Sequence, residues 1–368
     1  MKTYLKCAIS VMLFSSFAAC QLTPLGILDN EFNLNRAENT IKTSKNKSID
    51  SLSVFLKNLA PKPEIFVVHY GHKGVVVTIK GTVIHVENAV FVNEKGDIIK
   101  DNIRLTIQEL HTPSDMLLAD KPTNLNKTNG HLESFGEFKI TANHDGKPLA
   151  LQAGSSLTVE TEVTNTAKKQ FLKMPIWDAD TSDVRQQLKG LNHLAEPTSV
   201  TQFFSQKRGA TWTETPQSAR TNTFDRLQFD VVNLSKWKNC DIFRKDTTPK
   251  TTVMCHFAKN IAPSVFEGET TNQAAIYFKP LGINALIKFY EPILNAPLNK
   301  SGFYSEVNSL PIGTKGTLIA VSFLNGKLYA DQKDITINAP LNKEKAAFFS
   351  VYPVEINQAT FLNNLKNL

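Results

Sequence analysis

The chain has 368 residues, of which 41% are hydrophobic and 20% are charged, and its formal net charge is +7. This balance excludes a disordered or fibrous chain and is sufficient for two or three domains with buried cores. The basic residues are spread along the sequence and form no run, so the charge by itself indicates no particular partner.

The N-terminal segment has the layout of an export signal. Lys2 and Lys6 supply positive charge, and a short apolar run follows from Ala8 to Phe14. The run is too short for a membrane-spanning helix, which needs roughly 20 apolar residues. We therefore expect residues 1–19 to be a signal peptide that is removed and is not part of the fold.

The signal ends in Phe17-Ala18-Ala19-Cys20, which resembles the lipobox of bacterial lipoproteins. The resemblance implies that the Cys20 thiol carries a diacylglycerol and that Cys20 begins the mature chain, with acyl groups such as palmitate. The family prefers leucine three residues before the cysteine, and Phe17 departs from that. A plain secretory signal with an incidental cysteine is the alternative. Removing Lys2 and Lys6 gives a mature net charge of 7 − 2 = +5.

The next segments predict a tether and then a helix. Residues 20–47 are polar and asparagine-rich without periodicity, as in a flexible linker. Apolar residues then recur at helical spacing between a capping Ser48 and Pro61. We expect a short amphipathic helix here that packs on the first domain. Its apolar residues are Ile49, Leu52, Phe55, Leu56 and Leu59.

Residues 65–163 consist of β-branched runs such as "IFVVHY", "GVVVTIKGTVIHV" and "NIRLTIQEL", separated by turn signals such as "NEKGD" and "NHDGK". This spacing is typical of an all-β domain. The absence of strand–helix–strand alternation argues against a parallel nucleotide-binding sheet. The predicted fold class is mainly β, with two β-sandwich-like modules, a mixed insert and short flanking helices.

Part of this region resembles a known family. Residues 73–110, "KGVVVTIKGTVIHVENAVFVNEKGDIIKDNIRLTIQEL", are similar to the ZU5-type β-sandwich. Residues 132–160, "LESFGEFKITANHDGKPLALQAGSSLTVE", are similar to cell-envelope lipoproteins of Bacteroidota-type bacteria that carry such a module. The resemblance implies an N-terminal β-sandwich with its leading helix over residues 48–165.

The remainder of the chain divides into three predicted segments. Residues 166–235 form a mixed insert, in which "DTSDVRQQLKGLNHL" allows a short helix with Val184, Leu188 and Leu191 on one side. Residues 236–340 return to strands, with a hairpin at Asn325-Gly326, a dipeptide that readily takes positive φ. Residues 341–368 form a helical tail, with apolar positions at Ile356, Phe361, Leu362 and Leu365.

Two cysteines remain after the signal peptide and the lipidated residue are accounted for. Cys240 in "NCDIF" and Cys255 in "TVMCHF" flank the turn-rich "KDTTPK". A hairpin across this turn places them opposite each other, within bridging range. Because an exported protein meets an oxidising compartment, we expect a structural disulfide. Two free thiols, or a metal or catalytic role, are the alternatives.

Other candidate ligands form weaker patterns. His69 and His72 lie three apart, but a strand followed by glycine surrounds them and no third zinc ligand follows closely. Asp178, Asp180 and Asp183 have acidic spacing without the glycine and glutamate of a calcium loop, and Asp183 is also placed to cap a helix. We therefore expect loop histidines and no metal or cofactor site.

Large aromatic residues and dispersed acids leave two questions open. The tryptophans Trp177, Trp212 and Trp237 suit either a sugar- or peptide-binding groove or a packed core. The sequence contains no nucleophile elbow, phosphate loop or zinc-protease motif, so no catalytic residue is assigned. A glycosidase built on two carboxylates stays an alternative, because its acids need not be neighbours in sequence.

These features together predict a lipid-anchored cell-envelope protein with a non-catalytic binding or scaffolding role. The expected partners are the membrane, through the lipid on Cys20, and an envelope protein or a cell-wall polymer. An exported chain rarely meets nucleic acid, so none is expected. Gln21 stands where an aspartate argues for inner-membrane retention, which favours the outer membrane. The alternative is an envelope hydrolase that acts on cell-wall or glycan material through dispersed carboxylates.

Overall fold

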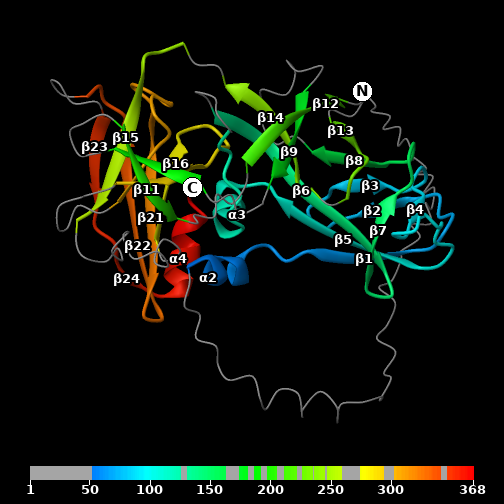
Figure 1. Cartoon of the computed structure of the whole chain (residues 1–368). Helices are drawn as coiled ribbons and strands as arrows, with labels where there is room; N and C mark the ends of the chain where they lie inside the picture. The colour runs from blue at the N-terminus through cyan, green and yellow to red at the C-terminus, as the bar shows by residue number, and fades with distance from the viewer. Residues whose placement is uncertain are drawn as a thin grey trace, which may run out of the picture. The chain divides into compact units, whose positions relative to one another are not determined.

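The fold is described by a computed structural model of the chain (Figure 1). All described residues belong to one compact unit of residues 48–368. The described residues are 52–125, 131–162, 174–180, 186–191, 197–204, 211–221, 226–234, 236–244, 247–258, 274–293, 302–340 and 346–368.

The N-terminal module is one large antiparallel sheet. Ten strands follow one another across it, and two short strands pair beside this path. In spatial order the ten are β1 (Glu64–Val68), β5 (Ile103–Leu110), β6 (His131–His144), β14 (Lys238–Arg244), β9 (Met174–Asp180), β12 (Thr211–Thr221), β13 (Arg226–Val231), β8 (Leu157–Glu162), β3 (Val83–His85) and β2 (Val75–Val77). The two short strands are β4 (Phe91–Val92) and β7 (Lys147–Leu151).

This sheet folds over a large apolar core. Along β5 the buried Ile103, Leu105 and Ile107 alternate with more exposed residues, because successive side chains of a strand point to opposite faces. The same core contains Ile84 of β3 and Phe229 of β13, which lie far across the sheet from β5. The arrangement is of the predicted β-sandwich type. Its sheet also contains β9, β12 and β13, which come from the predicted insert at residues 166–235, and β14, which follows that insert.

The C-terminal module consists of two five-stranded sheets around a second core. One sheet contains β18 (Glu291–Pro292), β19 (Gly302–Tyr304), β15 (Lys250–Phe257), β20 (Leu310–Pro311) and β23 (Ala346–Val351). The other contains β17 (Ile287–Phe289), β16 (Ala274–Pro280), β21 (Lys315–Leu324), β22 (Lys327–Thr336) and β24 (Val354–Ile356). The hairpin predicted at Asn325-Gly326 is confirmed: it joins β21 to β22, with φ of 52° and 76° at the two turn residues.

Three short helices cover the outer face of the β16–β21–β22 sheet. They are α2 (Leu52–Leu59), α3 (Pro113–Leu118) and α4 (Gln358–Leu365). The ring of Phe55 stacks on Phe323 with centroids 4.8 Å apart, and Phe361 packs beside it. The predicted amphipathic helix therefore exists, and it packs both on α3, within the predicted first domain, and on β21 of the C-terminal module. Its buried apolar residues share one cluster with Met116 and Leu117 of α3 and with Ile319 and Phe323 of β21.

Two further segments differ from the predictions. Residues 186–191 form strand β10 (Gln186–Leu191), paired with β11 (Pro197–Phe204), where a helix was expected. The pairing partner outweighs the weak helical spacing, as tertiary context commonly does. The expected helical tail contains α4, but β23 and β24 precede it. Strand β23 runs parallel to β15 and so belongs to the second sandwich.

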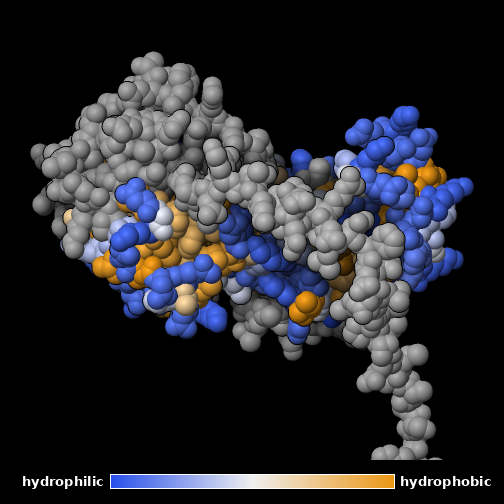
Figure 2. All heavy atoms as spheres, turned by 90° about the horizontal axis from the view of Figure 1, so that it is seen from below, coloured by the Kyte–Doolittle hydropathy of each residue, from blue (hydrophilic) through white to orange (hydrophobic). Residues whose placement is uncertain are grey.

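The surface is polar over part of the molecule and exposes aliphatic side chains on the edge strands of the large sheet. Figure 2 shows one large hydrophobic patch and several smaller ones on the same face, separated by hydrophilic side chains. The edge strands β1 and β2 expose Ile65, Val67, Val75 and Val77, each by roughly half or more. Among the described residues, no helix combines the length and the apolar character that a membrane crossing requires.

Candidate functional site

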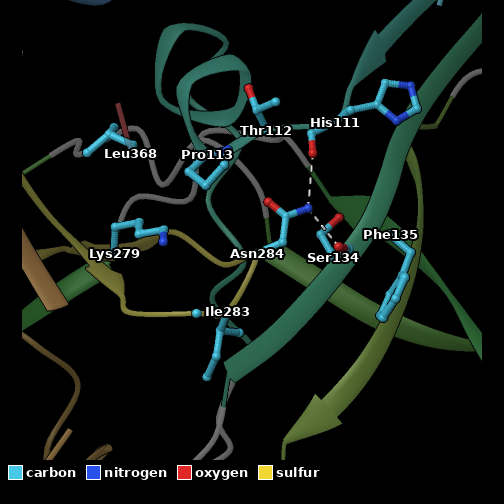
Figure 3. A pocket seen from close by; sticks show the side chains of 10 residues that line it. His111, Thr112, Pro113, Ser134, Phe135, Lys279, Ile283, Asn284 and Leu368 are labelled. Carbon is cyan, nitrogen blue, oxygen red and sulfur yellow. Dashed lines mark hydrogen bonds between the residues drawn. The ribbon is translucent and has the colours of Figure 1, made fainter. Parts of the chain in front are cut away.

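The candidate site lies on the seam between the two modules, where hydrogen bonds join the turn after β16 to β5 and β6. The side-chain amide of Asn284 donates to the carbonyl oxygen of His111 at 3.0 Å and to that of Ser134 at 2.8 Å (Figure 3). The Ser134 backbone N–H donates in return to the Asn284 carbonyl at 2.8 Å. Asn284 thus makes three hydrogen bonds across the seam.

A second set of seam bonds continues along β17. Thr123 and Leu286 exchange backbone and hydroxyl hydrogen bonds of 2.7 to 3.1 Å. Asn124 accepts from the Lys288 N–H at 2.8 Å and donates to its carbonyl at 3.0 Å. These hydrogen bonds, most of them between the Thr123 or Asn124 side chain and the backbone of β17 or of the residue before it, also join the two modules.

A pocket of about 410 Å³ opens along this seam. The volume falls within the roughly 300 to 1,000 Å³ common for small-molecule sites. We call it the seam pocket. Its lining residues are His111, Thr112, Pro113, Ser134, Phe135, Lys279, Gly282, Ile283, Asn284 and Leu368.

Local sequence explains the shape of two walls. Thr112 caps α3 in a reciprocal arrangement with Asp115, and Pro113 occupies the first helical turn, where a missing N–H costs nothing. On the opposite wall, Gly282 adopts φ of +74° in the turn that leaves β16. A side chain rarely takes that conformation, so the turn that presents Asn284 depends on glycine at this position.

Lys279 supplies the charge of the pocket. It lies on β16 and is half-buried, and burial lowers the pKa of its ammonium group. Within the described residues, no carboxylate pairs with it. In Figure 3 the ammonium group points toward the middle of the pocket, on the side of Pro113 and Asn284.

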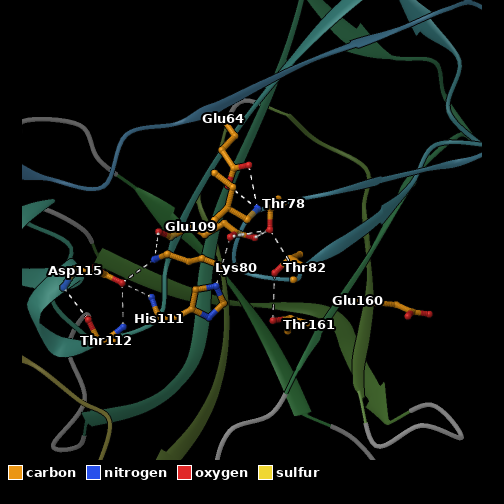
Figure 4. A network of polar contacts seen from close by, with 12 residues as sticks. Glu64, Thr78, Lys80, Thr82, Glu109, His111, Thr112, Asp115, Glu160 and Thr161 are labelled. Carbon is orange, nitrogen blue, oxygen red and sulfur yellow. Dashed lines mark hydrogen bonds and ion pairs between the residues drawn. The ribbon is translucent and has the colours of Figure 1, made fainter. Parts of the chain in front are cut away.

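The imidazole of His111 belongs to a different set of contacts. Figure 3 shows the ring pointing away from Asn284, and its Nε2 lies 3.7 Å from the Glu109 carboxylate. Thr78 donates its hydroxyl to the same carboxylate at 3.1 to 3.2 Å (Figure 4). Burial alone would raise the pKa of Glu109, but contacts with His111, Thr82 and Thr78 outweigh it and the pKa is lowered. Glu109 is therefore held as a buried anion.

This network also anchors α3 to β5. Asp115 accepts from the backbone N–H of His111 at 3.0 Å and pairs with the Lys80 ammonium at 3.0 Å. Lys80 also donates to the Glu109 carbonyl at 3.3 Å. These contacts provide hydrogen-bond partners for polar groups where the chain leaves β5 and enters α3 (Figure 4). The network therefore has a structural role: it positions Thr112, which lines the seam pocket.

Two further acids lie completely buried on β6 and β14. Burial, and then repulsion from Asp241, raises the pKa of Glu137 well above its ordinary value. Burial likewise raises the pKa of Asp241, and this effect exceeds the lowering of the pKa by hydrogen bonds, which include one with Ser134. The Asn239 side chain donates to Asp241 and accepts from the Ser134 hydroxyl. Neither acid lines the seam pocket, and burial favours the protonated form of each.

The predicted disulfide is wrong. Cys240 and Cys255 are both free and buried. Cys240 lies on β14 in the core of the N-terminal module, and Cys255 lies on β15 in the core of the other sandwich. The expected hairpin does not form, because β14 pairs with β6 and β9 while β15 pairs with β19, β20 and β23. The turn-like residues between them connect two modules.

The other candidate ligands are scattered. His69 contacts the Asn102 side chain in an exposed turn, and His72 lies three residues along. Asp178 pairs with Lys238 at 2.6 Å, whereas Asp183 lies outside the described residues, as does the lipidation candidate Cys20. In the part of the chain that the structure describes, no three metal-ligating side chains gather at one point.

The three tryptophans are packed in the interior and do not line a groove. Trp177, Trp212 and Trp237 share a buried cluster with Leu132. Two of the indoles have hydrogen-bond acceptors, as expected for buried indoles: Trp212 donates to the Pro122 carbonyl at 2.8 Å and Trp177 to the Asp241 carbonyl at 3.2 Å. The core interpretation of these residues is therefore the correct one.

The residues that form the seam pocket were not singled out in the sequence. Lys279 and Asn284 occur in "KPLGIN", an ordinary turn between strands, and Ser134 occurs within a continuous strand. A lysine–proline–glycine turn between two apolar strands is the only local signal, and it is too common to mark a site. No protein-family model, curated protein or solved structure matches this chain.

Proposed function

We propose that this protein is a lipid-anchored cell-envelope protein with a non-catalytic binding role, and that the seam pocket is its ligand site. The observation that carries the binding role is a pocket of about 410 Å³ whose walls come from both modules. A bound molecule would contact His111–Pro113 on one side and Lys279–Asn284 on the other. Its binding energy would therefore add to the contacts that hold the modules together.

The anchoring part of the proposal rests on the sequence. The charged and apolar opening, the Cys20 lipobox, the polar tether and Gln21 support lipid attachment, with the outer membrane favoured. Each buried acyl methylene contributes about 0.8 kcal/mol, so two or more chains give durable attachment. The resemblance of residues 73–110 to the ZU5-type β-sandwich and of residues 132–160 to envelope lipoproteins fits a module of this kind.

Anchoring is tested by following the full-length precursor in cells. We expect the protein to fractionate with membranes and to incorporate labelled palmitate. Cys20→Ser should abolish the label and release the protein from the membrane fraction, while Cys7→Ser should leave both unchanged. Labelling that survives in Cys20→Ser would contradict the proposal.

The composition of the pocket lining supports binding over hydrolysis. A glycan hydrolase needs two carboxylates, or a carboxylate and a histidine, that converge on the substrate. The lining residues include no Asp or Glu among the described residues, and the His111 ring faces Glu109 inside the protein. Glu137 and Asp241 are buried below the surface, where a polymer has no access.

The binding role is tested with N-phenyl-1-naphthylamine, a neutral fluorophore whose emission rises in dry sites. Ile283→Trp places a bulky ring in the pocket wall, and Leu281→Trp is the matched control because Leu281 is 68% exposed two residues earlier. We expect saturable fluorescence for the wild type and Leu281→Trp, and at least tenfold weaker binding for Ile283→Trp. Equal binding by all three proteins would refute the seam pocket as the site.

A further inference from the structure

We infer that the ligand of the seam pocket is a small anion with an apolar body, and this inference rests on the binding role proposed above. The pocket brings together one lysine ammonium group, one available hydroxyl donor and an apolar wall. Each of these features restricts the chemistry of the molecule that fits.

Among the described side chains of the lining, only one carries a formal charge. Lys279 is the only lysine, arginine, aspartate or glutamate among the described lining residues, and no ion pair satisfies its ammonium group within the described part of the chain. A half-buried cation is costly unless an anion pairs with it. A carboxylate or phosphate group of the ligand would supply that pair, and a cationic ligand would add repulsion.

The remaining polar groups indicate which atoms the ligand must present. Both amide hydrogens of Asn284 are already used, on the carbonyls of His111 and Ser134. The Ser134 hydroxyl donates to Asn239. The Thr112 oxygen accepts from the Asp115 N–H, and within the described residues its hydroxyl hydrogen has no acceptor. Of the Lys279, Asn284, Ser134 and Thr112 side chains, Lys279 and Thr112 thus retain donor hydrogens that acceptor atoms on a ligand would pair with.

The rest of the lining is apolar. Aliphatic side chains come from Pro113, Ile283 and Leu368. Phe135 also lines the pocket, but its ring packs in the core of the N-terminal module. Pockets of this type bind mainly through apolar contact and use a few polar groups to fix orientation. An acidic head on Lys279 and an apolar body against these residues satisfy both requirements.

The experiment uses matched probes on the non-lipidated mature chain, residues 20–368 with Cys20→Ser. The probes are 2-naphthoate, 2-naphthyl phosphate and the neutral isostere naphthalene-2-carboxamide, and isothermal titration calorimetry measures each affinity. Lys279→Met removes the charge and keeps the aliphatic stem. Lys279→Arg keeps the charge, and Lys147→Met is the control because Lys147 is exposed on β7.

We expect at least one of the two anions to bind the wild type roughly tenfold or more tightly than the carboxamide, since hydrogen bonds to charged groups are the stronger ones. Lys279→Met should remove that advantage, while Lys279→Arg and Lys147→Met keep it. Preference for the carboxylate or for the phosphate identifies the acidic group.

Two negative outcomes separate the two proposals. If the carboxamide binds as tightly as both anions and Lys279→Met changes nothing, the anion inference is overturned while the binding role survives. If no probe binds the wild type, and Ile283→Trp leaves N-phenyl-1-naphthylamine binding unchanged, the seam pocket is not a ligand site and both proposals fall.

Discussion

Asn284 and Ser134 are joined by two hydrogen bonds in opposite directions, each 2.8 Å long. One residue belongs to the turn after β16 and the other to β6, so this pair ties the two modules together at the wall of the seam pocket. Because the Asn284 amide also donates to the His111 carbonyl, its loss would leave two carbonyl oxygens without their partner.

Asn284→Ala is therefore expected to destabilise the protein by about 1 to 3 kcal/mol, because two partly buried acceptors lose their hydrogen-bond donor. Equilibrium unfolding in urea, read by tryptophan fluorescence, measures this change. Asn363→Ala on the exposed face of α4 is the control and should change the free energy of unfolding by less than about 0.5 kcal/mol. Equal effects at the two positions would contradict a structural role for the seam bonds.

The buried acid Glu137 makes stability fall as pH rises. Burial and the neighbouring Asp241 raise the pKa of Glu137 well above its ordinary value of 4.5. Above that ordinary value the unfolded chain has lost a proton that the folded protein still holds, so the free energy of unfolding declines toward neutral pH. Glu137→Gln should show a shallower decline between pH 5 and 8 in urea titrations.

The matched control for this prediction is Glu94→Gln, because Glu94 is exposed in a turn. Its pH dependence should follow that of the wild type. A decline in Glu137→Gln as steep as in the wild type would show that Glu137 does not retain its proton in the folded state.

Helix α2 stabilises the second sandwich even though it precedes the first strand. Phe55→Ala removes a ring that stacks on Phe323 and should cost about 3 to 5 kcal/mol. Hydrogen exchange should show the largest loss of protection in β21, with β1 retaining its protection. Val54→Ala, at a side chain that is 47% exposed, is the control and should have little effect.

The two cysteines should behave as free, inert thiols. Burial raises the pKa of Cys240 and of Cys255, which suppresses the reactive thiolate. In the mature chain with Cys20→Ser, we expect no reaction with Ellman's reagent in the native state. Two thiols should react after unfolding in guanidinium without a reductant. Fewer than two would indicate that the cysteines are oxidised.

By itself the sequence determined the features that depend on near neighbours. The alternation of Ile103, Leu105 and Ile107 specified a half-buried strand, and the Asn325-Gly326 dipeptide specified a hairpin. The spacing of Phe361 and Leu365 specified the last helix. Each of these signals comes from residues within a few positions of one another, where backbone geometry sets which side chains share a face.

Only the tertiary structure decided which elements meet. Cys240 and Cys255 are fifteen residues apart in sequence, yet their strands pair with partners in different modules. Lys279, Asn284 and Ser134 meet at one pocket although more than a hundred residues separate β6 from β16. Such contacts depend on the free energy of burying whole sheets and helices against one another, and no local pattern encodes which surfaces will match.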